Sequence, residues 1–335
     1  MSSPRPLRIG TRGSQLALWQ ARAVAARIAE SGGPPCEIVV IKTSGDRLQE
    51  APLSEVGGKR LFVKEIEEAL LGSGVDLAVH SSKDLPAVLP EGLRIAAVLP
   101  REDPLDAVVL PLPAQSSGVN VQGSRLEARG SATSGAWIDE LARRLGPTPS
   151  IGTGSVRRIA QLMRLFSKAR FTPIRGNLDT RLRKLDAGEH DALVLASAGL
   201  RRLGFADRIS LSLPPSACVP APGQGIVAIE AREHDAAVKV VAAIDDDAAH
   251  TALTAERTVV EALGGGCQMP LGALAVPVNE REIEIIAVVV APDGSRALHA
   301  RVRGVASEAV ALGARAAADL RDQGAAEILN KVGQT

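Results

Sequence analysis

The order of strand and helix patterns constrains the fold of this chain more than any other feature of its sequence. In the first hundred residues, strand-like runs at 7–10, 37–43 and 75–80 alternate with amphipathic helix patterns at about 15–30 and 61–71. Strands that alternate with helices form βαβ units, whose strands lie parallel in one sheet. We therefore expect an α/β fold built on a mostly parallel sheet.

The same order returns in the middle of the chain. A helix pattern at 156–166 is followed by a strand at 170–174, a helix at 179–188 and a strand at 191–196. The motif "IGTRGS" near the start and the motif "IGTGS" at 151–155 hold matching places in these two stretches. This echo suggests two α/β halves of like design.

Two segments depart from this alternation. Residues 113–149 are rich in Pro, Gly, Ser and Ala, which predicts a surface insertion with one short amphipathic helix at 137–145. From about residue 247 a helix precedes a glycine-rich loop, and strand-like runs at 282–290 and 296–303 lead into an Ala-rich helix. We expect this last part to form a separate small α+β domain.

Composition excludes several classes of protein. The net charge is +1, so no global field draws the chain to nucleic acid or to a membrane surface. The start lacks the apolar stretch of a signal peptide, and no apolar run approaches the roughly 20 residues of a membrane span. Three widely spaced cysteines and five scattered histidines favour neither a disulfide framework nor a metal site. We expect a cytoplasmic protein without metal.

Arginines gather where the predicted strands end. Arg157 and Arg158 fall in the first turn of a helix, the end at which the helix dipole disfavours cations but favours anions. Arg175 and Arg181 follow a strand of the second half, and Arg12 has the matching place in the first half. Solvated helix faces would explain some of these positions. Guanidinium forks from two domains would instead suit a ligand with several carboxylates.

One acid and one cysteine are further candidates for chemistry. Asp84 lies beside Lys83 directly after the strand at 75–80, on the expected ligand side of the sheet, although an Asp before Leu-Pro is also a common turn former. Cys267 lies in "LGGGCQMPLG", behind three glycines. Such a loop allows close approach of a ligand to the thiol, whereas a packing role would be the simpler alternative.

Nine segments that run in order through nearly the whole chain resemble the porphobilinogen deaminase family, also called hydroxymethylbilane synthase. They are "GTRGSQLALWQ", "KTSGD", "VGGKRLFVKEIEEALL", "DLAVHSSKDLP", "REDPLDAVV", "GTGSVRRIAQL", "IRGNLDTRLRKLDAGEHDALVLASAGLRRLG", "APGQG" and "LGGGCQMP". Only the insertion at 113–149 lies outside the resemblance.

The resemblance implies a transferase of tetrapyrrole biosynthesis. It would join four porphobilinogen molecules head to tail, with loss of ammonia at each step, and would release hydroxymethylbilane by hydrolysis. Its cofactor would be a dipyrromethane attached to Cys267, and Asp84 would assist ammonia loss and proton removal. The cofactor carboxylates would be held by Lys83, Thr153, Ser155, Arg157 and Arg158. The substrate would be held by Arg12, Ser14, Phe62, Arg175, Arg181 and Arg202.

The resemblance also implies the architecture and the partners. Two hinged α/β domains like those of periplasmic binding proteins would span 1–101 with 222–243 and 105–218, and a small α+β domain would span 247–335. The partner would be the small molecule porphobilinogen, with no nucleic acid and no membrane. The protein would be a monomer that passes its product to a tetrapyrrole-cyclising enzyme.

Two departures from the family pattern and two alternative functions remain. Gly154 stands where the family usually has a serine, and Glu55 stands where a lysine is common.

A non-enzymatic two-domain anion-binding protein would explain the arginines, but not the Cys267 loop. A transferase that uses Cys267 as its nucleophile would need a nearby base, which the sequence does not offer.

Overall fold

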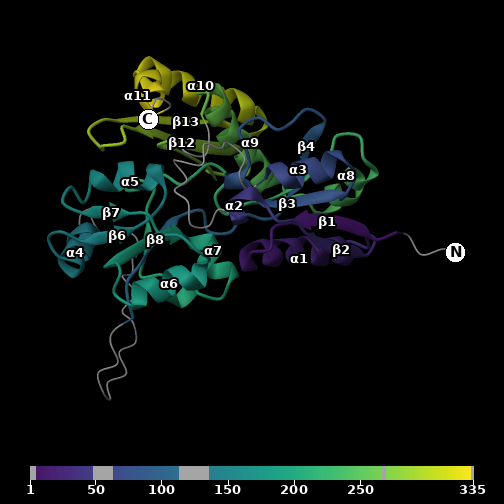
Figure 1. The fold of residues 1–335 in the computed structure, drawn as a ribbon. Coiled ribbons are helices and arrows are strands. Elements are labelled where there is room, and N and C mark those ends of the chain that lie inside the picture. The colour runs from purple at the N-terminus through teal and green to yellow at the C-terminus, as the bar shows by residue number, and fades with distance from the viewer. Residues whose placement is uncertain (1–4, 48–62, 113–135, 266–268, 333–335) are drawn as a thin grey trace.

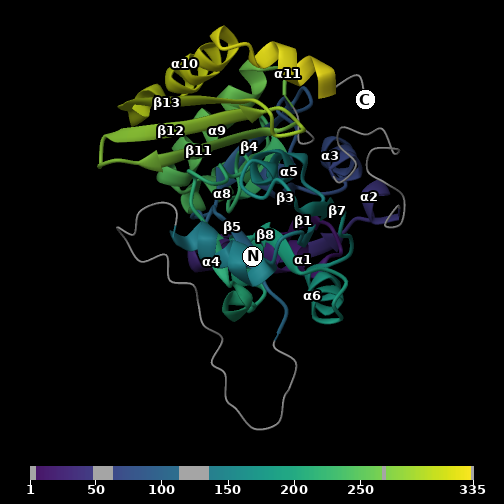
Figure 2. The same cartoon turned by 90° about the vertical axis from the view of Figure 1, so that its left-hand side faces the viewer.

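A computed structural model describes residues 5–47, 63–112, 136–265 and 269–332 of the chain. Their strands form three sheets, two with five strands and one with three. Each sheet carries its own helices, and Figure 1 shows the resulting three lobes. The first and second lobes lie side by side, and the third lies over both of them (Figures 1 and 2).

The first lobe contains the sheet β2-β1-β3-β10-β4. Its strands are β1 (Leu7–Thr11), β2 (Cys36–Val40), β3 (Leu77–Ser81), β4 (Leu93–Val98) and β10 (Val227–Arg232). Its helices are α1 (Gln15–Glu30), α2 (Ser44–Arg47), α3 (Lys64–Leu71) and α8 (Ala236–Val241), with 3₁₀ turns at Ser82–Asp84 and Ala242–Ile244. Val24 and Ile28 of α1 and Ile66 and Leu70 of α3 are fully buried in separate clusters against this sheet.

The second lobe contains the sheet β7-β6-β8-β5-β9. Its strands are β5 (Asp106–Val109), β6 (Ser150–Gly152), β7 (Arg170–Thr172), β8 (Ala192–Ala196) and β9 (Leu211–Leu213). Its helices are α4 (Ala136–Leu145), α5 (Val156–Met163), α6 (Leu178–Asp186) and α7 (Ser197–Arg202), with a 3₁₀ turn at Ala206–Arg208. The short helix expected at 137–145 is confirmed as α4, whereas residues 113–135 of the expected insertion lie outside the described residues.

The two five-stranded sheets share one topology, which confirms the prediction of two α/β halves of like design. Strands β1 and β6 each pair in parallel with both neighbours, whereas β10 and β5 each pair antiparallel with both. In each sheet four strands therefore run in one direction and a single strand runs against them, which agrees with the expectation of a mostly parallel sheet. The reversed strand arises because the chain crosses between the lobes twice, after β4 and after β9, and each crossing delivers one antiparallel strand to the other sheet.

The third lobe is the predicted α+β domain. Its antiparallel sheet consists of β11 (Leu271–Pro277), β12 (Glu282–Val290) and β13 (Ala297–Val305), and its helices are α9 (Asp247–Ala262), α10 (Ala309–Asp322) and α11 (Ala325–Val332), with a 3₁₀ turn at Ala306–Glu308. One face of the sheet packs against these helices. The other face packs against Ala160 of α5 and Val219 of the second crossing. The sequence analysis missed β11.

A buried carboxylate joins the third lobe to both crossings. Glu256 of α9 is fully buried and accepts hydrogen bonds from Nη1 of Arg101 at 2.6 Å, from the backbone N–H of Gly223 at 2.6 Å and from the backbone N–H of Ala275 at 2.7 Å. Nε of Arg101 donates to the carbonyl of Gln224 at 2.9 Å. Because every oxygen of this carboxylate has a partner, the burial of its charge is compensated.

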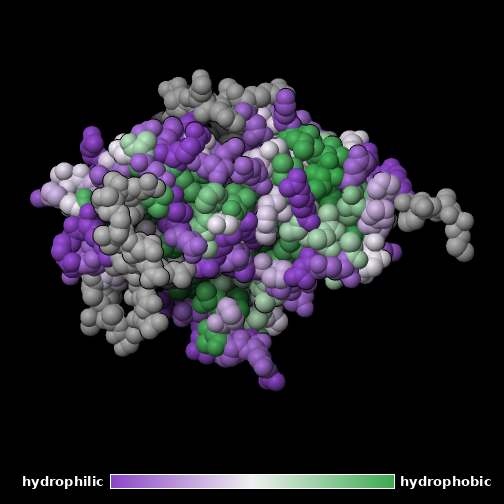
Figure 3. Space-filling model, turned by 90° about the horizontal axis from the view of Figure 1, so that it is seen from below, coloured by the Kyte–Doolittle hydropathy of each residue, from purple (hydrophilic) through white to green (hydrophobic). Residues whose placement is uncertain are grey.

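The fold class is thus confirmed, while the exact domain boundaries and any hinge motion stay predictions. Seen from below, the surface of the described residues mixes hydrophilic and hydrophobic side chains (Figure 3). In the described part of the chain, no helix has the length and apolar character needed to cross a membrane.

Candidate active site

The loop after β3 brings Lys83 and Asp84 to the carboxyl end of the first sheet. Ser82, Lys83 and Asp84 form one 3₁₀ turn, and the N–H of Ser82 donates to the carbonyl of Ile226 at 3.0 Å. Parallel strands β1 and β3 both end at this edge, where ligands of open α/β sheets bind. Among the described residues, no hydrogen bond or ion pair within 4 Å occupies the Asp84 carboxylate. It is therefore open to a ligand.

Helix α5 begins at the equivalent edge of the second sheet. Ser155 is its N-cap, and its hydroxyl accepts from the N–H of Arg158 at 3.4 Å, while Thr153 is buried just before it. A polar N-cap satisfies one of the free N–H groups of the first turn. The other N–H groups of this turn give the site a positive partial charge.

Arg157 and Arg158 share a buried counter-ion that the sequence analysis did not predict. Nη1 of Arg157 lies 2.7 Å from Oδ2 of Asp106, and Nε of Arg158 lies 2.9 Å from Oδ1 of the same residue. Gln224 donates to Oδ1 as well, at 3.0 Å. Although burial opposes its ionisation, the two arginines hold the pKa of Asp106 far below its usual range. Two guanidinium charges facing one carboxylate leave a net positive charge at the start of α5.

Lys83 faces this cluster from the first lobe. The pKa of Lys83 is lowered to about 8, chiefly by burial and also by the charges of Arg158 and Arg157, while Asp84 and Asp106 oppose the shift. Arg181 of α6 belongs to the same group of charges. Burial and the charge of Arg158 lower the pKa of Arg181, and the charge of Asp84 opposes that shift. The cations of both lobes therefore act on one another and on Asp84.

The turn before α6 positions Arg175 and Arg181. Gly176 has a φ of 104°, which an L-residue rarely adopts, and its carbonyl accepts from Nε of Arg181 at 2.9 Å. Arg175 precedes this glycine and also has an interaction partner. The terminal nitrogens of Arg181 lie beyond the bond to Gly176, and they can therefore face a ligand.

In the first lobe, Arg12 and Ser14 follow β1 as expected from the sequence. Ser14 is the N-cap of α1, and its hydroxyl accepts from the N–H of Ala17 at 3.2 Å. Nε of Arg12 lies 3.1 Å from Oδ1 of Asp46, and Asp46 also accepts from the hydroxyl of Thr43 at 2.8 Å. Arg12 is thus paired within its own lobe.

Arg202 connects the two α/β lobes. It extends from α7 and donates from Nη2 to the carbonyl of Gly225 at 2.7 Å. Its guanidinium carbon lies 5.4 Å from the ring centroid of Trp19 on α1, a cation–π distance. Burial lowers the pKa of Arg202 to about 10, so this arginine stays protonated at neutral pH. Its place at the junction of the lobes was not predicted.

A cavity at the meeting point of the three lobes joins these features. Its lining includes Ser82, Lys83 and Leu85 of the first lobe, Ser155 and Arg157 of the second, Ala221 and Pro222 of the second crossing, and Arg257, Val260, Gly265, Met269 and Leu271 of the third. Gly265 and Met269 flank residues 266–268, so Cys267 itself lies outside the described residues, as do Phe62 and Glu55.

The cavity suits a ligand with apolar rings and acidic side chains. Lys83 and Arg157 supply positive charge, and Leu85, Val260 and Met269 supply apolar surface. The buried hydroxyl of Ser82 has no hydrogen-bond partner among the described residues. Unpaired buried polar atoms are rare in proteins and call for a partner such as a ligand or water. No three His, Cys, Asp or Glu side chains of the described ranges gather as a metal site would require.

Comparison with known proteins agrees with this description. The sequence model of the family described as "Porphobilinogen deaminase, dipyromethane cofactor binding domain" matches residues 7–240, and that of "Porphobilinogen deaminase, C-terminal domain" matches residues 250–322. The chain belongs to the porphobilinogen deaminase family. Members of this family are transferases of porphyrin biosynthesis, and the cofactor of this enzyme is a dipyrromethane.

Individual relatives give the same assignment. Porphobilinogen deaminases from two strains of Acidithiobacillus ferrooxidans are 43% identical over 331 residues, 98% of this chain and 99% of theirs. Among solved structures, a periplasmic sulfonate-binding protein of Methylobacillus flagellatus covers 77% of this chain and 68% of its own at 12% identity and a TM-score of 0.35. An ancestral amino-acid-binding protein covers 70% and 86% at 14% identity and a TM-score of 0.33. Both structural similarities are weak.

The structure brings together Lys83, Asp84, Arg157, Arg158 and Arg181. It holds Arg12 and Arg202 in ion-pair or cation–π contacts nearby, and it leaves Phe62 and Cys267 outside the described residues. Sequence reasoning missed Asp106 and Arg257. The signal for Asp106 was a charged residue directly before the apolar run "AVVL", where a buried strand does not tolerate an unpaired charge.

Proposed function

We propose that this enzyme is a hydroxymethylbilane synthase, which joins four porphobilinogen molecules head to tail and then releases the linear tetrapyrrole by hydrolysis. One observation supports the proposal above all: the residues on both sides of Cys267 line the same cavity as Lys83, Ser155 and Arg157. From these flanking residues we infer that the cofactor attachment point belongs to this basic cavity, beside the loop that carries Asp84. The alternative of a non-enzymatic anion-binding protein gives no reason for that arrangement.

The residues that fit the dipyrromethane come from the cavity wall and from residues 153–158 at the start of α5. Lys83, Thr153, Ser155, Arg157 and Arg158 would hold its acetate and propionate groups, and Cys267 would hold it covalently. When bound, the dipyrromethane supplies the free pyrrole carbon to which the first substrate is joined. Because Asp106 neutralises only one of two arginine charges, the start of α5 retains the positive charge that these carboxylates require.

Of the two carboxylates in the cluster, Asp84 has the catalytic role in this proposal. Asp106 is fully buried and its oxygens accept from Arg157, Arg158 and Gln224, so it cannot take part in proton transfer. Asp84 is partly exposed, and its neighbours Lys83 and Leu85 line the cavity. It would donate a proton to the leaving ammonia, stabilise the positive charge that develops on the substrate ring and then accept the ring proton. Arg12, Ser14, Phe62, Arg175, Arg181 and Arg202 would hold the substrate carboxylates and ring.

The intact mass of the denatured enzyme tests the assignment. Wild-type protein should carry an adduct of two pyrrole units, and digestion should map it to the peptide that contains Cys267. The variant Cys267→Ser should lack the adduct, whereas Cys36→Ser, which alters the half-buried cysteine of β2, should retain it. An unmodified mass after incubation with porphobilinogen would exclude the proposed function.

Replacement of Asp84 tests its role separately. Asp84→Asn should fold and carry the adduct, while turnover falls by about 10²–10⁴, the usual contribution of general acid–base catalysis. Asp207→Asn, which changes an exposed acid of the second lobe, is the matched control and should turn over normally. Wild-type rates for Asp84→Asn would remove Asp84 from the mechanism.

The remaining expectations also belong to this proposal. A single chain supplies every residue named above, which supports a monomer. We further propose that the enzyme works in the cytoplasm, without nucleic acid or membrane as a partner. Its linear product would pass to a tetrapyrrole-cyclising enzyme. The domain boundaries 1–101 with 222–243, 105–218 and 247–335 are proposed on the same basis, and the two crossings between the sheets support them.

A further inference from the structure

We propose that Arg257 is a positioning residue that fixes the Asp84 loop on helix α9. The inference rests on the proposed function, because it concerns how the acid of that function is held in place. Arg257 lies on α9 in the third lobe, and no motif in the sequence pointed to it.

The contacts of Arg257 reach directly into the catalytic loop. Its Nη2 donates to the carbonyl of Pro86 at 2.8 Å and to the carbonyl of Ala87 at 2.7 Å. Only Leu85 separates Pro86 from Asp84. The ring of Pro86 fixes one backbone dihedral at this point. Two charge-assisted bonds to successive carbonyls therefore restrict the orientation of the segment that carries the Asp84 side chain.

Helix α9 is a suitable reference for this loop because it is itself held firmly. The neighbouring residue Glu256 is bonded to Arg101, Gly223 and Ala275, that is, to both crossings and to β11. Ten residues after Arg257, the same helix has ended and the chain reaches Cys267. One helix thus contacts the crossings through Glu256 and the Asp84 loop through Arg257.

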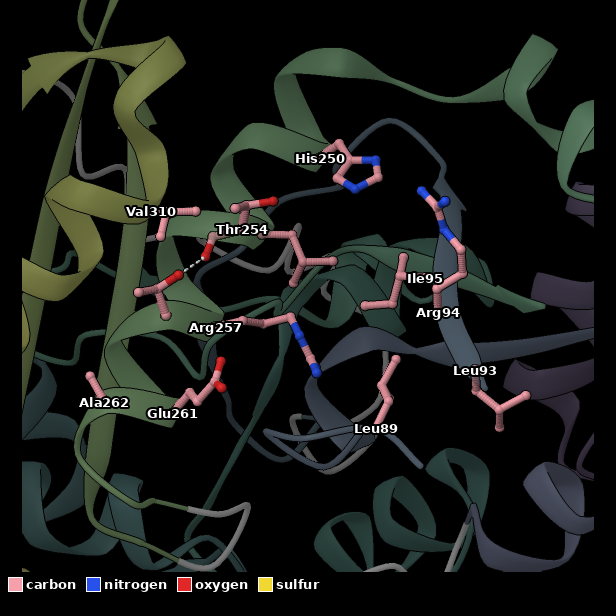
Figure 4. Close-up of a pocket in the computed structure, with 12 residues that line it drawn as sticks. Leu89, Leu93, Arg94, Ile95, His250, Thr254, Arg257, Glu261, Ala262 and Val310 are labelled. Carbon is pink, nitrogen blue, oxygen red and sulfur yellow. Dashed lines mark hydrogen bonds between the residues drawn. The ribbon is translucent and has the colours of Figure 1, made fainter. Parts of the chain in front are cut away.

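Arg257 also forms the wall between two hollows of the surface. It lines the cavity that contains Lys83 and Ser155, and it lines an outer groove between β4 and α9 with Leu89, Arg94, His250 and Glu261. Figure 4 shows its side chain projecting from α9 into the space between the two elements, with Arg94 on the opposite wall. Arg257 therefore borders both the cavity and the outer groove.

A direct role in binding substrate carboxylates is the competing reading of the same arginine. The two readings differ in which kinetic constant they change. Loss of a carboxylate contact raises KM, whereas misplacement of Asp84 lowers kcat, since only the transition state requires its exact orientation. Displacements of about 1 Å at a catalytic group can cost on the order of 10²-fold in rate.

The test compares Arg257→Gln, Arg257→Lys and Arg94→Gln with the wild-type holoenzyme. For Arg257→Gln we expect kcat to fall by about 10–10²-fold with KM within about threefold, and the dipyrromethane adduct to be retained. Hydrogen exchange of the peptide spanning residues 82–90 should become faster. Arg257→Lys should recover part of kcat, because one ammonium can still reach a carbonyl. Arg94→Gln, on the opposite wall of the groove, should behave as wild type.

Each result has a defined meaning. Unchanged kcat and unchanged exchange for Arg257→Gln would overturn the inference, and a rise in KM alone would assign Arg257 to substrate binding instead. A loss of activity in proportion to lost folded protein or lost adduct would also overturn it, as a general structural effect. A wild-type enzyme without the adduct would instead refute the proposed function, so the two failures are distinguishable.

Discussion

Lys83 loses its positive charge at a lower pH than the arginines around it. A lysine ammonium loses much of its hydration when it is covered, and it shifts its pKa readily, whereas a guanidinium remains protonated. Burial and the charge of the nearby Arg158 together lower the pKa of Lys83 to about 8. Among the cations proposed to hold the cofactor, Lys83 is therefore the one whose charge changes within the working range of pH.

Loading of the unmodified protein with cofactor should therefore depend on pH. Below about 8 Lys83 is protonated and attracts carboxylates, and above that value it becomes neutral and the attraction is lost. We expect the extent of adduct formation at limiting porphobilinogen to fall as pH rises through 8. Intact mass measured between pH 6.5 and 9.5 checks this. Lys83→Arg keeps its charge over the whole range, so its loading should stay flat, and matching profiles for the two proteins would contradict the assignment.

At the scale of elements, the sequence predicted the helices and strands whose pattern is formed by neighbouring residues. Strand β12 and strand β13 were predicted almost to their ends because their residues form long, apolar-rich runs bounded by a turn at 292–295. Strand β11 was missed, since its segment "LGALAVP" is short and rich in small residues that carry little strand signal.

The site could be predicted by residue type but not by pairing. Arg157 and Arg158 were expected to face a ligand, and nothing near them in sequence revealed that Asp106, about fifty residues earlier, lies between them. The exchange of β5 and β10 between the sheets is also a long-range event, and it is this exchange that places Asp106 beside α5. Pairings of this kind are set by the fold as a whole and leave no local pattern.

The start of α5 should depend on Asp106 for its stability. Asp106→Asn would leave two buried guanidinium groups with a neutral partner, and breaking such a buried pair costs about 3–5 kcal/mol. We expect the midpoint of urea unfolding to fall accordingly, with loss of cofactor loading. Glu140→Gln removes a carboxylate that pairs with Arg143 and Arg144 on the exposed side of α4, and it should leave the midpoint nearly unchanged. Equal midpoints for the two variants would show that Asp106 is not needed as a counter-ion.

At the scale of the whole molecule, a chain with a net charge of +1 concentrates positive charge where three lobes meet. Lys83 comes from the first lobe, Arg157, Arg158 and Arg181 come from the second, and Arg257 comes from the third. The overall charge therefore gives no indication of the local potential at the cavity. The same junction includes Arg202, which contacts the first lobe through Trp19 and the second crossing through Gly225.

The contact between Arg202 and Trp19 allows changes at the junction of the lobes to be followed by tryptophan fluorescence. The chain has two tryptophans and no tyrosine, so in a Trp137→Phe variant the emission of Trp19 alone is observed. If the proposed substrate carboxylates bind Arg202, its guanidinium must turn toward them and leave the Trp19 ring. We expect porphobilinogen to change the emission of the Trp137→Phe protein, and Arg202→Gln in the same background to shift the starting emission and abolish the response. Trp19→Phe, which retains only Trp137 on α4, should not respond. A substrate that turns over normally without altering Trp19 emission would show that Arg202 keeps its contact with α1 throughout the reaction and acts as a fixed link between the lobes.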